Sequence, residues 1–257
     1  MKSKASLHEH LRTSSNLQPE DFNQAIDLAA ARLGDHGIFA LTNFEDKRYE
    51  YFTSLPGYSR DYIGENHSAI YIPEKQILVV KAQEVPTKQG HLLVLGLGIG
   101  ENLKPNQTLE ETIKQAIDHN AIKIADHPFF SHGIGPYLEN HPELIGLFDA
   151  IETHNGEAIY GNKKAERFYN SLGWDQYKLG ALSSSDGHSM HELGKSWTEI
   201  DFPNITQSKE FIPSLKKAIK FADLRTNQKN HTSYRGAIEH MAKLAIAKIA
   251  QKLELEY

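Results

Sequence analysis

The sequence has no cysteine among its 257 residues and no apolar run near the roughly 18 residues that a membrane-spanning helix needs. The first absence excludes disulfides and thiolate metal ligands and fits a reducing cytoplasm. The N-terminus also lacks the apolar segment of a secretory signal. Positive charge is not in excess, since 28 Lys and Arg stand against 33 Asp and Glu, a net charge of −5. This balance excludes a bulk attraction to nucleic acid or anionic membranes, and we expect a cytoplasmic protein with no membrane contact.

Helical and strand patterns alternate along the chain, and its length suffices to bury the core of one α/β domain. The region between residues 47 and 75 has no clear period and is expected to form lid-like loops. The two C-terminal stretches follow a helical period, and their lysines are more typical of a solvated helix face than of a nucleic-acid patch. Helices are expected at 19–33, 108–120, 142–147, 162–172, 208–220 and 234–255, and strands at 7–11, 37–42, 76–81, 91–97, 122–125, 149–152 and 179–183.

His8 and His10 are one residue apart in a predicted strand, so they share a face while Glu9 points away. Histidines and acids also stand where later predicted strands meet loops. In a β/α barrel these ends share one face, where barrel enzymes place their chemistry. Taken singly, each histidine could equally be an ordinary core or surface residue rather than a metal ligand. Together, imidazoles and carboxylates without a thiolate suit Zn, Mn or Fe. The later residues are Glu84, His91, His127, Asp186 and His188, with Glu152 and His154 as possible neighbours.

Four short stretches, in this order, resemble the motifs of the polymerase and histidinol phosphatase (PHP) superfamily. The resemblance runs from Leu7 to about Thr198. It implies a distorted (β/α)7 TIM-like barrel over residues 1–205, with additional C-terminal helices at 206–257 packed on the same domain. It also implies a metal-dependent phosphoesterase. The stretches are Leu7-His8-Glu9-His10, Glu84 with Gly90-His91-Leu92-Leu93, Ala125-Asp126-His127-Pro128, and Ser185-Asp186-Gly187-His188.

The resemblance also implies which residues hold the metals. A first ion would be held by His8, His10, Glu84 and Asp186, and a second by Glu84, as a bridge, with His91 and His127. The family's third site is altered, because Asn43-Phe44 and Asn16 stand where ligands are expected, and only His188 remains. We therefore expect two divalent transition-metal ions (Zn, Mn or Fe). Glu45 and Asp46 are the alternative ligands for a weak third ion.

Two ions about 3.5–4 Å apart would activate a water and clamp phosphoryl oxygens. Guanidinium groups match phosphate in a bidentate way, which favours Arg12, although a solvated surface charge is an equal alternative. We expect His188, freed from metal binding, to contact a phosphate oxygen or protonate the leaving group. The expected catalytic residues are His188, Arg12 and Asp186, and the candidate substrate-binding residues are Arg12, Lys47, Arg48, Asn43 and His154.

The expected substrate is a small phosphate ester or a nucleotide, with nucleic acid as a further option, and the oligomeric state stays open. If Phe44 lines the metal pocket beside His188, it would favour a planar, apolar leaving group. Two other functions remain. One is an amidohydrolase-like metal hydrolase acting on a carbon centre, although Lys81 is poorly placed, before Glu84, to bridge metals. The other is a non-catalytic module that binds metal or phosphate.

Overall fold

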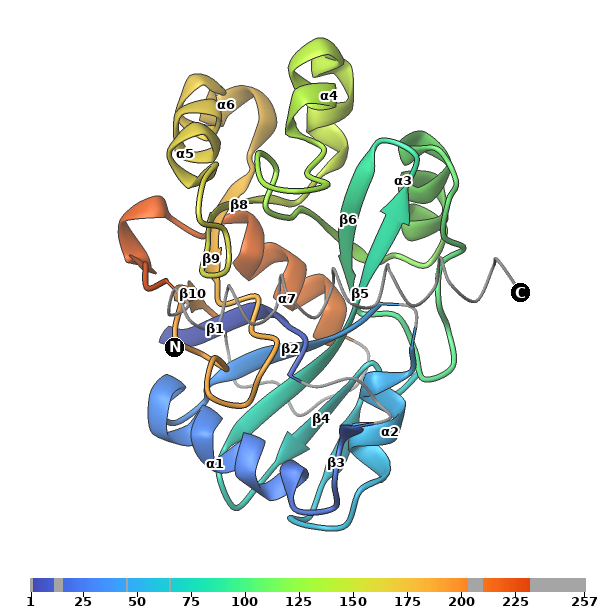
Figure 1. The fold of residues 1–257 in the computed structure, drawn as a ribbon, viewed down its shortest axis with the longest axis vertical. Coiled ribbons are helices and arrows are strands. Elements are labelled where there is room, and N and C mark those ends of the chain that lie inside the picture. The colour runs from blue at the N-terminus through green and yellow to red at the C-terminus, as the bar shows by residue number, and fades with distance from the viewer. Residues whose placement is uncertain (1, 12–15, 45, 65, 203–209, 232–257) are drawn as a thin grey trace, which may run out of the picture.

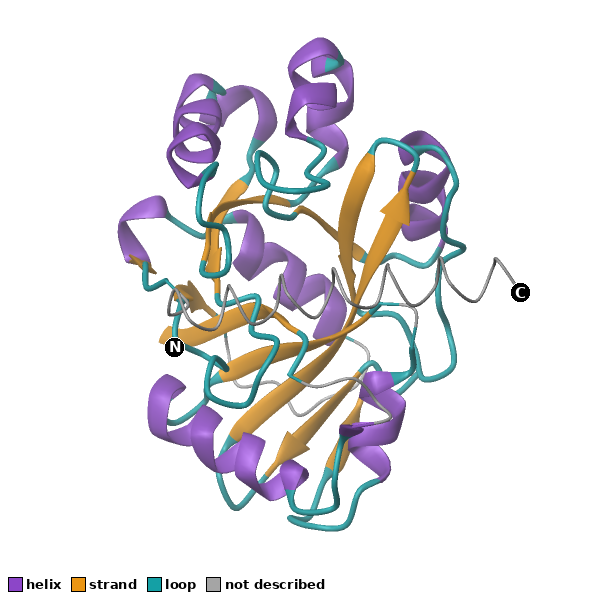
Figure 2. Ribbon diagram, viewed as in Figure 1, coloured by secondary structure: helices purple, strands orange, loops and turns teal. Residues whose placement is uncertain are grey.

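The computed structural model describes residues 2–11, 16–44, 46–64, 66–202 and 210–231. Within these ranges the strands form one strongly curved sheet, with helices packed around it (Figures 1 and 2). The strands are β1 (Lys2–Glu9), β2 (Ile38–Asn43), β3 (Asp61–Ile63), β4 (Ala69–Ile72), β5 (Ile77–Thr87), β6 (Gly90–Leu95), β7 (Ile122–Ala125), β8 (Ala150–Asn155), β9 (Gly180–Ser184), β10 (Trp197–Asp201) and β11 (Asn227–Gln228).

The sheet curves until its two sides nearly meet. Its order is β11-β10-β1-β2-β5-β6-β7-β8-β9, with β3 and β4 attached beside β5. Between β9 and β1, the Asp186 N–H donates to the His8 carbonyl at 2.9 Å, and the His10 N–H donates to the Gly187 carbonyl at 2.9 Å. These bonds bring the segment after β9 against the end of β1. The result is a distorted, nearly closed barrel, which confirms the predicted fold class.

The barrel is not parallel throughout, and this corrects the parallel arrangement expected from the sequence. β1, β2 and β5 run parallel to one another, as do β7, β8 and β9. β6 is antiparallel to both of its neighbours, β5 and β7. The beginning of β6, which carries His91, therefore lies at the same end of the barrel as the carboxyl ends of β5 and β7.

The helices follow local signals in the sequence. In α3, the Thr108 side chain accepts the Glu111 N–H while Glu111 accepts the Thr108 N–H, so the predicted capping box is present. In the described part of the chain, no helix combines the length and the apolarity that crossing a membrane requires. The helices are α1 (Asp21–Leu33), α2 (Arg48–Ser54), α3 (Leu109–Asp118), α4 (Gly135–Asn140), α5 (Asn162–Ser171), α6 (Trp174–Tyr177), α7 (Phe211–Lys220) and the 3₁₀ segments η2 (Pro142–Leu147) and η3 (Leu224–Thr226).

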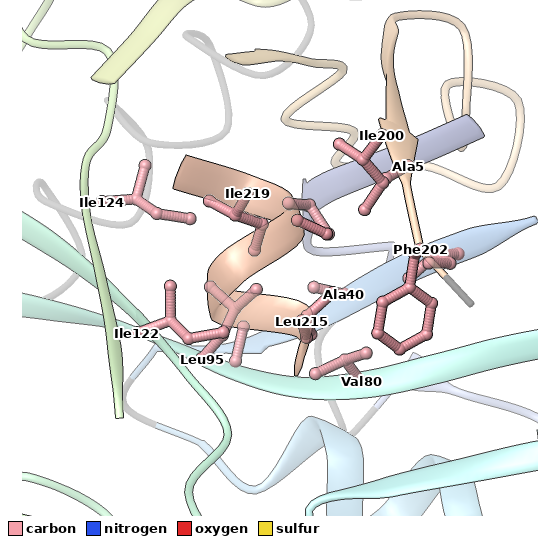
Figure 3. Packing of buried hydrophobic residues seen from close by; sticks show 14 of the residues in the cluster. Ala5, Ala40, Val80, Leu95, Ile122, Ile124, Ile200, Phe202, Leu215 and Ile219 are labelled. Carbon is pink, nitrogen blue, oxygen red and sulfur yellow. The ribbon is translucent and has the colours of Figure 1, made fainter. Parts of the chain in front are cut away.

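Helix α7 packs against the inner faces of the barrel strands. Its residues Leu215 and Ile219 share one hydrophobic cluster with Ala40, Val80 and Ile122 from β2, β5 and β7 (Figure 3). The alternate residues of β2 and β5 point outward and pack against α1 and α2 in a second cluster. Near the end of α7, the Ala222 carbonyl accepts the Ala181 N–H close to the start of β9. The helix therefore lies towards the amino ends of the strands, which leaves the carboxyl ends for the site.

Residues 47–75 are not the loop region that the sequence predicted. They contain α2 and the antiparallel pair β3 and β4, and β4 adds to β5. The prediction was wrong because the apolar residues of this region, such as Tyr49, Phe52 and Ile70, are spread over three short elements, each too short to show a period. β10 and α4 were also missed. The predicted helix at 234–255 lies outside the described residues.

Candidate metal centre

The residues that the sequence predicts as metal ligands lie together at one end of the barrel. They form overlapping groups whose nitrogen and carboxylate oxygen atoms lie within 4.8 Å of one another. His8 lies in β1, Glu84 in β5 and His91 in β6. The other ligands lie in the segments directly after β1, β7 and β9. The groups are His8, His10 and Glu84; Glu84, His91, Asp126 and His127; and His10, Asp186 and His188.

The first group, to which Asp186 adds a fourth donor, has spacings close to those around a metal ion. His8 Nε2 lies 3.1 Å from His10 Nε2, and Asp186 Oδ1 lies 3.5 Å and 3.4 Å from these two nitrogens. Glu84 Oε2 lies 3.1 Å from His10 Nε2 and 3.9 Å from His8 Nε2. Four ligands at about 2.0–2.2 Å from a zinc ion at the centre of a tetrahedron are about 3.3–3.6 Å apart. The distances from His8 and His10 to the two carboxylates are therefore close to those between donors around one transition-metal ion.

The second group uses the other oxygen of the same carboxylate. Glu84 Oε1 lies 2.5 Å from His91 Nδ1 and 3.1 Å from His127 Nε2. Asp126 Oδ2 lies 3.4 Å from His127 Nε2 and is a fourth donor that the sequence did not assign, although it stands in a quoted motif. Glu84 thus presents one oxygen to each group, which is the arrangement of a carboxylate that bridges two ions.

Two buried carboxylate oxygens support a cation at each position. Within the described ranges, Asp186 Oδ1 in the first group and Asp126 Oδ2 in the second have no hydrogen-bond partner. Leaving a buried carboxylate oxygen unsatisfied is costly, whereas a bound cation would satisfy it. The donor set of imidazoles and carboxylates is one that Zn, Mn and Fe accept.

His188 stands beside the first group. Its ring stacks on the His10 ring with 4.5 Å between centroids, and its Nδ1 lies 3.0 Å from Glu157 Oε2 and 3.0 Å from the Asp186 carbonyl. Burial opposes protonation of His188, but Glu157 and then Asp186 outweigh it and raise the pKa of His188 to about 9. The imidazole is therefore a cation at neutral pH when the centre carries no metal.

Glu84 and His127 hold each other in their charged forms. Burial disfavours the charged form of Glu84, yet hydrogen bonds from His10, His127 and others keep the pKa of Glu84 well below its ordinary value. Burial also opposes protonation of His127, but Asp126 and Glu84 raise the pKa of His127 to about 10. Protons thus occupy positions where a metal ion would otherwise supply the positive charge.

A shell of polar residues behind the ligands fixes their orientation. Glu152 Oε1 lies 3.6 Å from His8 Nδ1, and Glu152 Oε2 accepts the His127 N–H at 2.7 Å. The Asn155 side-chain amide donates to Glu152 at 2.9 Å and to Asp186 at 3.0 Å. The sequence analysis named Glu152 as a possible neighbour but missed Asn155 and Glu157. In the sequence, what pointed to these two residues was their position at or just after the end of β8.

Glu9 turns away from the metal ligands, as the strand period predicts. It accepts the Ser6 hydroxyl at 2.5 Å and the N–H groups of Gly187 and Gly194 at 3.2 Å and 2.9 Å. A Cβ on Gly187 would lie 2.6 Å from Glu9 Oε2 and 2.9 Å from Glu192 Cβ. Glycine is therefore needed where the chain between Asp186 and His188 passes β1.

Among the predicted substrate-binding cations, Arg48 lies against the cluster. Its Nη1 atom is 2.7 Å from His10 Nδ1, and its Nε donates to Asp46 at 2.9 Å. Asp46, the alternative third-ion ligand, is thus paired with Arg48. Lys47 is exposed to solvent. Arg12 and Glu45 lie outside the described residues.

Asn43 and His154 make structural contacts. Asn43 accepts the Tyr49 N–H at 2.8 Å and donates to Glu50 at 2.8 Å, which holds the first turn of α2 on β2. His154 Nε2 lies 3.1 Å from the Asn230 carbonyl. A role for either side chain in binding substrate stays a prediction that these contacts do not support.

The altered third site matches the expectation in part. Asn16 is exposed at the surface. The Phe44 ring does lie at the cluster, with its centroid 5.5 Å from that of His91 and an edge-to-face arrangement. The sequence placed Phe44 beside His188, whereas this contact puts it next to the second group.

Fold and site together define a class of protein, a TIM-like barrel with clustered His and carboxylate side chains at one end that could hold metal ions. Residues 160–219 match the family model described as PHP-associated. This match and the fold confirm the resemblance to the PHP superfamily.

Two solved structures share the fold. PsfC from Pseudomonas syringae PB-5123 is 14% identical, with a TM-score of 0.62 over 96% of this chain and 99% of PsfC. The lesion-specific endonuclease PfuEndoQ from Pyrococcus furiosus is 16% identical, with a TM-score of 0.56. That match covers 86% of this chain but 56% of the endonuclease. A comparison with curated proteins finds no significant match.

Proposed function

We propose that the protein is a metal-dependent phosphoesterase with a dinuclear centre. The observation that carries this proposal is the geometry of Glu84, whose Oε2 lies 3.1 Å from His10 while its Oε1 lies 3.1 Å from His127. One carboxylate shared between two donor groups brings two cations close together. Two such ions, when bound, polarise a phosphoryl oxygen and lower the pKa of a water towards neutrality.

The chain's own residues supply the remaining functions. Arg48, anchored by Asp46, presents a guanidinium beside His10, where it can donate to phosphoryl oxygens that gain charge. His188, held by Glu157 at 3.0 Å, lies on the same side of the centre and carries a proton for the leaving oxygen. The side chains of the ligand cluster are largely buried.

The similarity to a PHP-associated family model and the fold shared with a lesion-specific endonuclease support a phosphoester as the substrate class. The substrate is a small phosphate ester or a nucleotide, with a nucleic-acid end as the larger alternative. Two divalent ions of Zn, Mn or Fe are the proposed cofactors.

The contacts of Lys81 disfavour the alternative reaction at a carbon centre. Its Nζ donates to Glu50 Oε1 at 2.5 Å and to the carbonyls of Gly98 and Glu101 at 2.7 Å each. These bonds use all three donors of the ammonium group. Lys81 therefore does not act as a metal-bridging lysine, and it instead anchors the glycine-rich segment after β6.

The test combines metal analysis with catalysis. The full chain, purified without chelator, is analysed for metal per chain and then assayed for phosphate release from phosphomonoesters and phosphodiesters. We expect about two ions per chain and turnover. Asp186→Asn should abolish turnover and lower the content to about one ion, because the amide replaces a carboxylate ligand of the first group only. Asp118→Asn, at the exposed end of α3, is the matched control and keeps both ions and turnover.

Full metal content without turnover of any phosphoester would instead favour a non-catalytic binding module. Little metal even after reconstitution would overturn the dinuclear centre itself.

A further inference from the structure

The second metal-ligand group continues outward into aromatic side chains. The Phe130 ring lies edge-to-face with His127 at 6.3 Å between centroids, and Tyr160 lies edge-to-face with Phe130 at 4.9 Å. On the other side, Phe44 contacts His91 at 5.5 Å. A continuous row of rings therefore leads from the ligands to the surface.

The outer part of this row is exposed. The Tyr160 side chain is 59% exposed and Ile159 is 54% exposed, while Phe130 is half-buried between Tyr160 and the ligands. We call Phe130 and Tyr160 the aromatic patch. Large apolar side chains that gather on the surface beside a catalytic centre mark a binding surface more often than isolated ones do.

Backbone contacts hold the aromatic patch in place. Its residues come from the segments after β7 and β8, at the same end of the barrel as the metal ligands. The Phe130 N–H donates to the His127 carbonyl at 2.9 Å, so the ring is tied to a ligand residue. Gly161, with a φ of +96°, passes so close that a Cβ there would lie 2.4 Å from the Phe129 carbonyl oxygen. The two segments therefore pack directly on each other.

The two sides of the centre differ in chemistry. Arg48 and His188, which can donate to phosphoryl oxygens, lie beside His10 in the first group. The aromatic side chains lie beside His91 and His127 in the second group. A phosphate ester placed across the centre would thus direct its phosphoryl oxygens to one side and its organic group to the other.

We propose, on the basis of the phosphoesterase function above, that the aromatic patch stacks a planar aromatic group carried by the substrate. The substrate class is then a phosphate ester bearing a nucleobase or an arene. Aromatic faces stack with any planar ring, and edge-to-face neighbours such as Phe130 and Tyr160 leave ring surface open to a third.

The experiment compares substrates that differ only in the planar group. Adenosine 5′-phosphate and ribose 5-phosphate release the same kind of primary alcohol, so leaving-group acidity does not separate them. Benzyl phosphate and cyclohexylmethyl phosphate form a second pair that tests an arene. With the metal-loaded full chain, we expect kcat/KM to be at least about fivefold higher for the aromatic member of one pair or both. Preference within the first pair alone identifies a nucleobase, and within the second an arene.

Variants at Tyr160 then test whether the aromatic patch causes the preference for the aromatic substrate. Tyr160→Ala is expected to abolish most of it, mainly through KM, while the ring-preserving Tyr160→Phe keeps it. Because Tyr160 is exposed, neither change should alter metal content or the circular dichroism spectrum. Phe221→Ala, which removes an aromatic side chain that is 64% exposed at the end of α7, is the matched control.

The outcomes separate the two proposals. Equal kcat/KM within both pairs, or a preference that survives Tyr160→Ala, would overturn the aromatic subsite while leaving the phosphoesterase intact. No turnover of any of the four esters by metal-loaded protein, together with none on the wider phosphoester panel, would overturn the phosphoesterase and with it this subsite.

Discussion

The Asn155 side-chain amide donates to Asp186 Oδ2 at 3.0 Å. The same nitrogen donates to Glu152, which in turn lies behind His8, so one neutral side chain connects two acids at the back of the centre. Such supporting hydrogen bonds orient metal ligands, and their loss commonly lowers metal affinity about 10- to 100-fold.

Asn155→Ala should therefore weaken metal binding by about 10- to 100-fold without unfolding the barrel. A competitive titration with a metal-sensitive dye measures the affinity. Asn140→Ala, at an exposed position whose amide donates to the Pro136 carbonyl within α4, is the control and should leave the affinity unchanged. Unchanged affinity in Asn155→Ala would show that Asp186 needs no such support.

The shared carboxylate of Glu84 predicts an unequal loss of metal between two variants. Glu84→Gln should lower the content at both positions, because an amide cannot offer two charged oxygens. His91→Ala removes a donor from the second group only and should retain about one ion per chain, since the first group keeps its four donors. Elemental analysis after dialysis measures both, with the exposed Glu20→Gln as control. Equal losses in the two variants would contradict a bridging role for Glu84.

Replacing Lys81 should strongly lower the stability of the fold. Its side chain is fully buried and its ammonium pairs with Glu50, so Lys81→Met leaves a carboxylate without its partner. Breaking a buried pair in this way costs about 3–5 kcal/mol of the free energy of unfolding. Lys75→Met, which removes a partly exposed pair with Asp27, should cost at most about 1 kcal/mol. Urea denaturation measures both variants, and similar losses would contradict the assignment of Lys81 as an anchor.

Glu9 predicts a pH dependence of stability. Burial raises the pKa of Glu9 from its ordinary value of 4.5 to about 8, despite the Ser6 hydrogen bond and the N–H donors. Between these values the folded state holds a proton that the unfolded state has released. The contribution of Glu9 to the free energy of unfolding should therefore be fully present below pH 4.5 and be lost as the pH rises to about 8. The slope from this one proton is at most about 1.4 kcal/mol per pH unit.

Denaturation of the wild type and of Glu9→Gln across this pH range isolates the contribution of Glu9. The difference between the two curves should change steadily with pH, because glutamine does not titrate. A constant difference would show that Glu9 is already ionised in the folded protein at low pH.

Many residues of the metal centre could be predicted from local sequence patterns. The alternation in β1 correctly separated His8 and His10 from Glu9, and the Thr108 capping box correctly began α3. These signals depend on neighbours within a few residues, where strand period and helix capping act. The misassigned region at 47–75 shows the limit, since each of its short elements is stabilised by contacts with distant strands.

By itself, the sequence determined which residue types stand at the strand ends and in what order, because these follow from local periods and from short motifs. Only the tertiary structure decided that β6 also pairs with β7, and so joins the two parallel sets of strands into one barrel. It also decided that Asn155 supports Asp186 and that Arg48 contacts His10. Each of these contacts joins segments far apart in the sequence, and how they meet is set by how the whole sheet packs its core.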